Sequence, residues 1–422
     1  MPPLLTRPFL LLVLGHFLQA LGYSSMLLLP LYLEHLGADR EEIGTLMALA
    51  AGGGLVSRPF AAWALDAWGR RPTLLLGTAL LATSMALFHF VRDLGWLVYA
   101  DRVLLGVGSG TLFTGYFTWA TDLVPPERRT EGIALFGISG LVPIGLNAFV
   151  GGRGFDPADL RALFVAVSLL IACSIPAVLA LPETLDRAAR APGHGGWRGA
   201  LGSLLVRRLW PVWLATVVFA GFVGLFFAFA TVTAQHRGVA RPSLLWLAYA
   251  GGAVGVRLIG SRLPDRVGPR NLVTPALGLY LGAMLLCARA ASSEGFLAAG
   301  LLAGLAHGWC FPVLVSQVVA RTPAVWRGSA LAGFTATWQL AELLAPPAFG
   351  RFGDARGRDA DLYLLAVVAG LGGLALWAAL EATLGREERS AGHASGAEVP
   401  GAGRASAAPD AAEAGAVEAV EG

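Results

Sequence analysis

The sequence predicts an all-α integral membrane protein with twelve transmembrane helices arranged as two pseudo-symmetric six-helix bundles. Of its 422 residues, 55% are hydrophobic and only 14% are charged, whereas about a quarter of the residues in a soluble domain carry charge. The hydrophobic residues form repeated blocks of about twenty, the length that a helix needs to cross a bilayer. A charged motif also recurs at matching places in the two halves of the chain.

Hydropathy predicts the twelve spans in order, and the short alternating segments of a membrane β-barrel are absent from the sequence. The spans lie at about 8–31, 43–64, 73–91, 96–118, 130–152, 161–181, 208–233, 243–262, 271–290, 294–319, 328–350 and 360–382.

One long connection separates six spans from six and defines the predicted domains. Residues 1–181 form the N-terminal six-helix bundle, 182–207 a cytoplasmic linker and 208–384 the C-terminal bundle. Residues 385–422 are rich in Ala, Gly and Glu, a composition typical of a disordered low-complexity tail.

The arginines in the loops predict the orientation. With the N-terminus inside, 20 of the 31 arginines fall on the cytoplasmic side and ten on the other, while Arg102 lies within the fourth span. This two-to-one bias favours two cytoplasmic termini in a multi-pass protein of the cell inner membrane.

Several function classes are excluded or disfavoured. A net charge of +3, with arginines scattered over short loops, argues against a nucleic-acid surface. Cys173, Cys287 and Cys310 lie in apolar blocks without a C-x-x-C spacing, so we expect no disulfide, metal site or cofactor. No Walker motif is present in the sequence, so ATP cannot drive the protein directly.

An internal repeat relates the two halves. Four residues recur with a displacement of 199 positions, as Arg58, Asp66, Gly69 and Arg71, and then as Arg257, Asp265, Gly268 and Arg270. Because six spans per repeat is an even number, both copies face the same side and the repeats are parallel. Such halves typically form a transporter with its site between them.

The repeated segments resemble the signature of the major facilitator superfamily. "RPFAAWALDAWGRRP" is similar to the loop 2–3 motif G-x-x-x-D-R/K-x-G-R-R/K, and "RLIGSRLPDRVGPR" to its second copy; the likeness covers about residues 8–382. The first glycine of the motif is replaced by Ala62 and Ser261, and its first basic residue by Ala67 in the N-terminal copy. The resemblance implies alternating access by rocking of the two bundles.

The resemblance also implies a cytoplasmic charge network that latches the bundles in the outward-facing state. Its residues here would be Asp66, Gly69, Arg70, Arg71, Asp122, Asp265, Arg266, Gly268 and Arg270. The alternative is that Arg70 and Arg71 only anchor the loop on the cytoplasmic side.

Two further segments resemble motifs of the same family. "GISGLVPIGLNAFVGG" (137–152) is similar to the fifth-span motif of proton-coupled antiporters, although the residue before Pro143 is not glycine. "GLAHGWCFP" (304–312) resembles a tenth-span pattern. Small residues and proline in a membrane helix are equally typical of close packing and a kink.

Charged and polar residues within a predicted span indicate a functional or structural role, because a charge at the centre of a spanning helix costs about 2.5–3.5 kcal/mol on insertion scales. Glu342 lies just past the middle of the eleventh span, on one helical face with Thr335 and Gln339. A carboxyl group removed from water favours its neutral form and could exchange a proton near neutral pH. We therefore take Glu342 and His16 as proton-coupling candidates, with a structural, hydrogen-bonded glutamate as the alternative.

Other polar residues of the spans are candidates for the substrate cavity. The family resemblance places spans one, four, seven and ten around it. The candidates are Gln19, Tyr23, Arg102, Thr111, Thr114, Asn147, His307 and Gln339. A structural role is the alternative for each histidine and threonine.

The sequence thus predicts a secondary active transporter of a small organic solute, monomeric and most simply driven by a proton gradient for efflux. An importer or uniporter of a sugar or organic anion is the alternative with the same fold. A membrane-embedded lipid-modifying enzyme is a distant alternative, since no loop offers a catalytic cluster.

Overall fold

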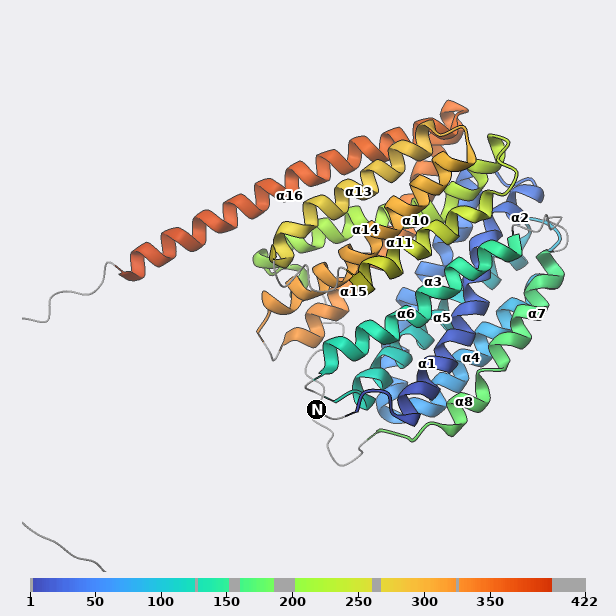
Figure 1. The fold of residues 1–422 in the computed structure, drawn as a ribbon, viewed down its shortest axis with the longest axis horizontal. Coiled ribbons are helices and arrows are strands. Elements are labelled where there is room, and N and C mark those ends of the chain that lie inside the picture. The colour runs from blue at the N-terminus through green and yellow to red at the C-terminus, as the bar shows by residue number, and fades with distance from the viewer. Residues whose placement is uncertain are drawn as a thin grey trace, which may run out of the picture.

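The computed structural model describes residues 3–125, 128–151, 160–185, 202–259, 267–323 and 326–396, and all regular secondary structure in that part of the chain is helical. Figure 1 shows the helices of the N-terminal half, blue to green, packed beside those of the C-terminal half, yellow to red. Helices suit a bilayer because each satisfies its own backbone hydrogen bonds.

The N-terminal half consists of six helical spans, two of which are interrupted. They are α1 (Arg7–Tyr23) with η1 (Ser24–Leu28) and α2 (Leu29–His35); α3 (Arg40–Ala67); α4 (Arg70–Leu87) with η2 (Phe88–Phe90); α5 (Trp96–Leu123); α6 (Arg129–Gly151); and α7 (Leu160–Ala172) with α8 (Ile175–Ala180).

The described part of the C-terminal half also provides six long helices. After η5 (Arg207–Leu209) these are α10 (Trp210–His236); α11 (Leu245–Ile259), preceded by η6 (Pro242–Leu244); α13 (Pro269–Arg289); α14 (Ser293–Ala320); α15 (Arg327–Arg356); and α16 (Asp359–Gly396). Together the described helices match the twelve predicted spans and confirm the fold class.

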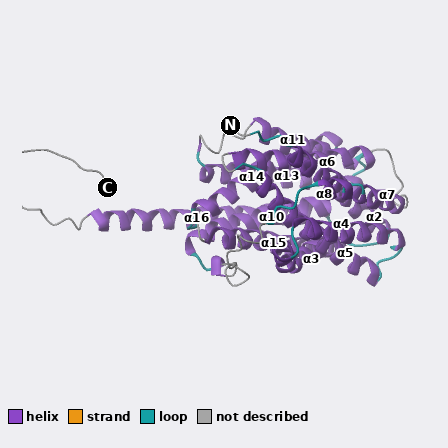
Figure 2. Cartoon of the chain, turned by 90° about the horizontal axis from the view of Figure 1, so that it is seen from below, coloured by secondary structure: helices purple, strands orange, loops and turns teal. Residues whose placement is uncertain are grey.

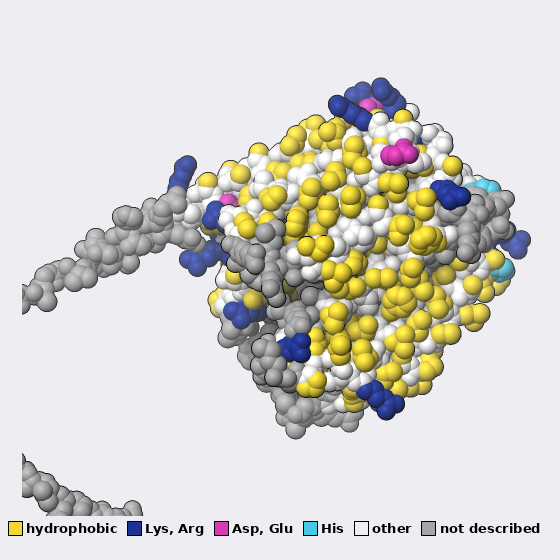
Figure 3. All heavy atoms as spheres, in the orientation of Figure 1, with side chains coloured by type: hydrophobic (Ala, Val, Ile, Leu, Met, Phe, Trp, Pro, Cys, Tyr) yellow, Lys and Arg dark blue, Asp and Glu magenta, His cyan; other side chains and the backbone are white. Residues whose placement is uncertain are grey.

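Eight of these segments are long and apolar enough to cross a membrane by length and composition alone. Of the other four long helices, α3, α5 and α15 each contain three or more charged residues, and α6 contains the shorter apolar stretch Leu135–Leu146 among the described residues. Figure 3 shows a broad band of hydrophobic side chains with arginines gathered near its two edges. The protein is thus a multi-pass membrane protein.

Two positions fix where the spans begin or break. Asp39 caps α3, since its carboxylate accepts from the backbone N–H of Glu42 while the Glu42 side chain accepts from that of Asp39. The predicted span 161–181 is divided at Ser174, whose hydroxyl donates to the Ile171 carbonyl, because Pro176 cannot continue the hydrogen-bond ladder of α7.

Close helix packing inside each half depends on small residues. A side chain on Gly106 of α5 would collide with the backbone of Ala50 on α3, and one on Gly304 of α14 with the backbone of Tyr249 on α11. Small residues of this kind let membrane helices approach closely. Each half therefore packs as a tight bundle.

The last helix is longer than predicted. α16 continues to Gly396 and projects beyond the other helices (Figure 2). The expectation of disorder from residue 385 is thus wrong up to residue 396. Alanine, glutamate and arginine favour helix, so the spanning helix continues past the apolar block. Residues 397–422 lie outside the described residues.

The bundle has two ends, named here for use below. The linker end holds the start of α1, the α3–α4 turn and the residues on either side of the linker, 182–185 and 202–207. The far end holds the turn at Gly37, the end of α10 and the start of α16.

Candidate functional site

The two halves meet most extensively along two pairs of helices, α3 with α15 and α6 with α11, and α10 also contacts α2 and α3. On the α3 side, Gly44 is so close to the backbone of Pro346 that any side chain would collide with it. On the α6 side, a Cβ on Gly145 would lie 2.9 Å from the Cβ of Ala250. These interfaces position the intramembrane polar residues.

Glu342 lies at the α3–α15 interface, where it faces the other half. Its carboxyl group lies close to the indole of Trp338 and within electrostatic reach of Arg58 on α3. The guanidinium of Arg58 donates through Nε to Oε1 of Gln339 at 2.5 Å and lies 5.9 Å from the ring centre of Phe113. An acid of one half thus faces a cation of the other.

Tyr23 and His307 border the same region. Tyr23 is 41% exposed, and its hydroxyl is within electrostatic reach of Glu342. The ring of His307 on α14 packs against that of Trp338, with 6.0 Å between the ring centres. Its Nδ1 lies 2.6 Å from the hydroxyl of buried Tyr249. The structure therefore brings four predicted residues together: Tyr23, His307, Gln339 and Glu342.

His16 and Gln19 have partners elsewhere in the N-terminal half. Nδ1 of His16 lies 2.6 Å from the hydroxyl of Ser139 on α6. The amide of Gln19 is buried and donates to the hydroxyls of Thr78 at 2.7 Å and Ser174 at 2.9 Å. Both donors of the Gln19 amide are thus used to join α1 to its neighbours, which favours a structural role.

Arg102 is also buried within its own half. Its guanidinium donates to the carbonyls of Leu46 at 2.7 Å and Met47 at 3.3 Å, so it ties α5 to α3. The hydroxyls of Thr111 and Thr114 donate to carbonyls one turn earlier in α5. Asn147 belongs to α6, but its side chain lies outside the described residues.

A charged cluster at the linker end surrounds the repeated motif of the N-terminal half. Arg70 pairs with Asp122 at 3.0 Å and lies 3.6 Å from Asp66. Glu183 accepts from the backbone N–H groups of Arg70 at 2.9 Å and Arg71 at 3.0 Å. Burial opposes ionisation of Glu183, but these bonds outweigh it and hold its pKa below the ordinary value.

Gly69 explains why the motif needs glycine at this position. Its φ of +113° lies in the left-handed region, and a Cβ there would lie 2.7 Å from a carboxylate oxygen of Glu183. The second copy, Gly268, has a φ of +87°. The glycine thus lets the carboxylate reach the first N–H groups of α4, where a helix favours negative charge.

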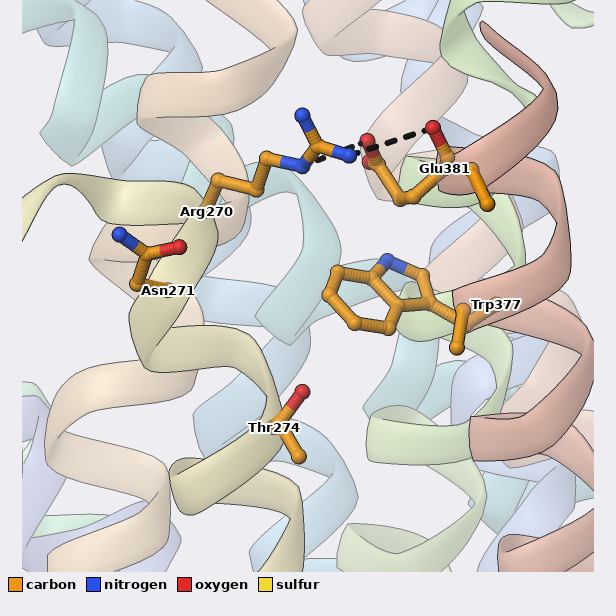
Figure 4. Close-up of a pocket in the computed structure, with 7 residues that line it drawn as sticks. Arg270, Asn271, Thr274, Trp377 and Glu381 are labelled. Carbon is orange, nitrogen blue, oxygen red and sulfur yellow. Dashed lines mark hydrogen bonds and ion pairs between the residues drawn. The ribbon is translucent and has the colours of Figure 1, made fainter. Parts of the chain in front are cut away.

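An equivalent cluster lies at the linker end of the C-terminal half. Glu381 of α16 pairs with Arg270 of α13 at 2.9 Å and with Arg321 of α14 at 2.5 Å. Figure 4 shows Arg270 and Glu381 beside a cavity of about 330 Å³, which Asn271, Thr274 and Trp377 also line. Asp265 and Arg266 lie outside the described residues, so the second motif is described only at residues 257–259 and from residue 267.

Among the described residues, the contacts of Arg70, Asp122, Glu183, Arg270 and Glu381 stay within one half each. The predicted latch between bundles is therefore still a prediction, and these residues here brace each bundle internally. Sequence reasoning missed Glu183 and Glu381, which lie after the sixth span and near the end of the twelfth.

Charged residues at the far end, by contrast, join the two halves. Asp359 of α16 accepts from Arg40 of α3 at 2.6 Å and contacts Nδ1 of His236 at 2.7 Å. Nε2 of His236 contacts Glu34 of α2, and Arg40 also pairs with Asp354 at 3.0 Å. Both ring nitrogens of His236 face carboxylate oxygens, an arrangement that only the protonated imidazole satisfies. We call Glu34, Arg40, His236, Asp354 and Asp359 the far-end cluster.

The sequence contained no local signal for the far-end cluster. Its partners are 123 to 319 positions apart and lie at helix ends, where charges are ordinary. Arg58 and Arg257, in contrast, carried a signal: each falls inside an apolar block and belongs to the repeat.

Known proteins with similar sequences belong to one family of membrane transporters. A family model described as Major Facilitator Superfamily matches residues 12–293 and 242–410. An uncharacterized MFS-type transporter of Burkholderia mallei (strain SAVP1) is 25% identical over 354 residues, covering 81% of this chain and 84% of that protein. One of Pseudomonas aeruginosa (strain LESB58) is 26% identical over 361 residues, covering 83% and 87%.

Solved structures share the fold at low identity. The nucleoside transporter NupG matches with a TM-score of 0.74 and 12% identity, over 89% of this chain and 99% of that one. A POT family transporter in complex with a thioalcohol conjugated peptide matches with a TM-score of 0.75 and 13% identity, over 89% and 96%. At such identity the likeness shows the fold alone.

Proposed function

The chain belongs to the major facilitator superfamily of membrane transporters, and we propose that it is a secondary active transporter that exports a small organic solute in exchange for protons. The observation that carries the proposal is the position of Glu342 in the C-terminal half, three residues after Gln339, whose side chain accepts a hydrogen bond from Arg58 of the N-terminal half; Arg58 is also within electrostatic reach of Glu342. Protonation of Glu342 would remove the attraction between the two charges and so change the contact between the bundles.

The proposed orientation places the linker end in the cytoplasm, as the distribution of arginines indicates. In that orientation the far-end cluster closes the outer side of the bundle interface. Export as the direction rests on the likeness of residues 137–152 to the fifth-span antiporter motif. In the structure, Pro143 of that segment lies inside α6, a helix that contacts α11 of the other half.

Uptake of an organic anion is the second candidate. The observation that favours it is Arg257, an intramembrane cation of α11 without an ion pair among the described residues. The two candidates differ in the direction in which solute and protons move relative to one another.

Transport into proteoliposomes tests both candidates. Purified protein would be offered a panel of aromatic carboxylates, aromatic amines and neutral analogues, with the lumen either acidic or alkaline. Weak acids and bases distribute passively with a pH gradient, so accumulation is measured relative to protein-free liposomes. Excess accumulation toward an acidic lumen indicates exchange, whereas excess accumulation toward an alkaline lumen indicates cotransport with protons.

Glu342→Gln tests the proton site in the same vesicles. We expect the variant to lose gradient-driven accumulation while it still equilibrates solute without a gradient, because the amide cannot exchange a proton. Asp361→Asn, which removes an acid from the start of α16, is the matched control and should accumulate solute normally. Undiminished accumulation by Glu342→Gln would exclude Glu342 as the proton carrier.

A further inference from the structure

Arg257 differs from the other described arginines inside the membrane. Arg58 bonds to Gln339 and faces Glu342, and Arg102 bonds to two backbone carbonyls beside Asp101. Arg257 is half-buried near the linker end of α11, and no carboxylate of the described chain lies within 4 Å of its guanidinium. Arg58 and Arg102 have the carboxylates of Glu342 and Asp101 within electrostatic reach but beyond 4 Å, whereas Arg257 has no such carboxylate among the described residues.

Arg58 and Arg257 are equivalent positions of the internal repeat, but they differ in their partners. Arg257 is the copy of Arg58, displaced by 199 positions, and each lies at a helix pair that joins the two halves. Arg58 meets the side chains of α15, whereas Arg257 meets Gly137 of α6, which has no side chain to offer. One copy of the arginine is thus paired and the other faces a position that is left without a side chain.

The surroundings of Arg257 are polar on one side and aromatic beyond. Tyr249 and His307, bonded to each other at 2.6 Å, both lie within its electrostatic reach. Past His307 the rings of Phe219, Phe311 and Trp338 pack together. The ring centre of Trp338 lies 4.8 Å from that of Phe219 and 5.7 Å from that of Phe311. This wall suits an apolar ring better than a sugar.

We propose that Arg257 binds the carboxylate of the transported solute, which is an organic anion with an aromatic body that packs against Trp338 and its neighbours. An unpaired cation inside a membrane protein is costly, and a bound anion supplies the missing partner. A guanidinium matches a carboxylate with two parallel hydrogen bonds. The proposal rests on the function as a transporter, and an anionic solute favours the second candidate, uptake together with protons.

Equilibrium binding to the purified protein in detergent tests the site without any gradient. Salicylate and 2-naphthoate would be titrated by calorimetry, with the neutral amides of both as isosteres. We expect the carboxylates to bind and the amides to bind at least about tenfold more weakly, since a hydrogen bond to a charged group is lost. Absence of carboxylate binding to the wild-type protein, or equal binding of the amides, would overturn the proposal.

Variants of Arg257 assign the site. Arg257→Gln should weaken carboxylate binding by about 10- to 100-fold and leave amide binding unchanged, while Arg257→Lys should retain part of the affinity. Arg289→Gln, on the exposed end of α13, removes the same charge elsewhere and should bind normally. Equal affinities in Arg257→Gln and Arg289→Gln would show that Arg257 is not the anion site.

These outcomes are independent of the proton-exchange proposal. Loss of coupling in Glu342→Gln concerns flux under a gradient, whereas the Arg257 variants are read by affinity at equilibrium. A protein that binds carboxylates through Arg257 but shows no proton-driven accumulation would keep the anion site and refute the coupling.

Discussion

Asp359→Asn should open the far end of the bundle interface more often. Asp359 accepts one charge-assisted contact across the interface, from Arg40, and one within its own half, from His236, which in turn contacts Glu34 of the other half. Each such bond contributes about 1.5–3 kcal/mol. The low end applies here, since the side chains of Arg40 and His236 are 21% and 36% exposed. Asparagine keeps one oxygen that can accept one of the two bonds.

The net loss is therefore about 1.5–2 kcal/mol, which corresponds to a 10- to 30-fold change in the equilibrium between closed and open far ends. Single-molecule energy transfer between dyes at His89→Cys and Ala291→Cys, exposed positions of the two halves at this end, would record opening. The native cysteines would be replaced in this background. We expect the ratio of open to closed dwell times to rise by that factor.

Asp361→Asn is the matched control, because it removes the same charge from the same turn of α16. Dwell times of Asp359→Asn that equal those of Asp361→Asn would refute the reasoning that the far-end cluster holds the halves together. A rise in both variants would assign the effect to the charge of the helix start.

Two predictions concern the linker end. In Asp66→Asn, the same dye pair should report a lower ratio of open to closed dwell times at the far end. We expect a change of about two- to fivefold, which is the scale of an exposed ion pair, and unchanged dwell times would contradict the latch. Gly69→Ala should destabilise the protein by about 1–3 kcal/mol, since alanine disfavours a φ of +113° and its Cβ would meet Glu183. Thermal unfolding in detergent would measure this against Gly251→Ala, where a Cβ meets open space, and equal melting temperatures would contradict it.

The spans could be predicted because hydrophobicity over twenty residues is a local property. The break at Ser174 could not, since an apolar block with one proline is typical of both a kinked and an interrupted helix. The length of α16 was underestimated because low hydropathy ends a span but does not end a helix. Helix formers such as Glu387 and Arg389 continue it into water.

The candidate site could be predicted only in part. Periodicity placed Gln339 and Glu342 on one face of a helix, and they lie together in the structure. Periodicity along one helix does not show which neighbour that face contacts. The polar face of α1 therefore suggested Gln19, whose hydrogen bonds join α1 to neighbouring helices of its own half. Arg58 on α3 was not among the candidates, because its partner Gln339 lies 281 positions away in the sequence.

The charges at the interface bear on the direction of transport. Protonation of Glu342 removes a negative charge from the group of residues that includes Tyr249, and Tyr249 is also within electrostatic reach of Arg257. An anion at Arg257 is therefore attracted more strongly when Glu342 is protonated, because charges in a protein interior are weakly screened. Exchange requires that binding of the solute weakens binding of the proton and the reverse, whereas cotransport requires that each strengthens binding of the other.

An anion bound at Arg257 thus supports cotransport, and a neutral or cationic solute that competes with the proton at Glu342 supports exchange. Solute charge and direction are linked by the same two residues. Accumulation of a carboxylate toward an alkaline lumen would establish uptake and overturn export, because one arrangement of charges cannot make the anion both follow and oppose the proton.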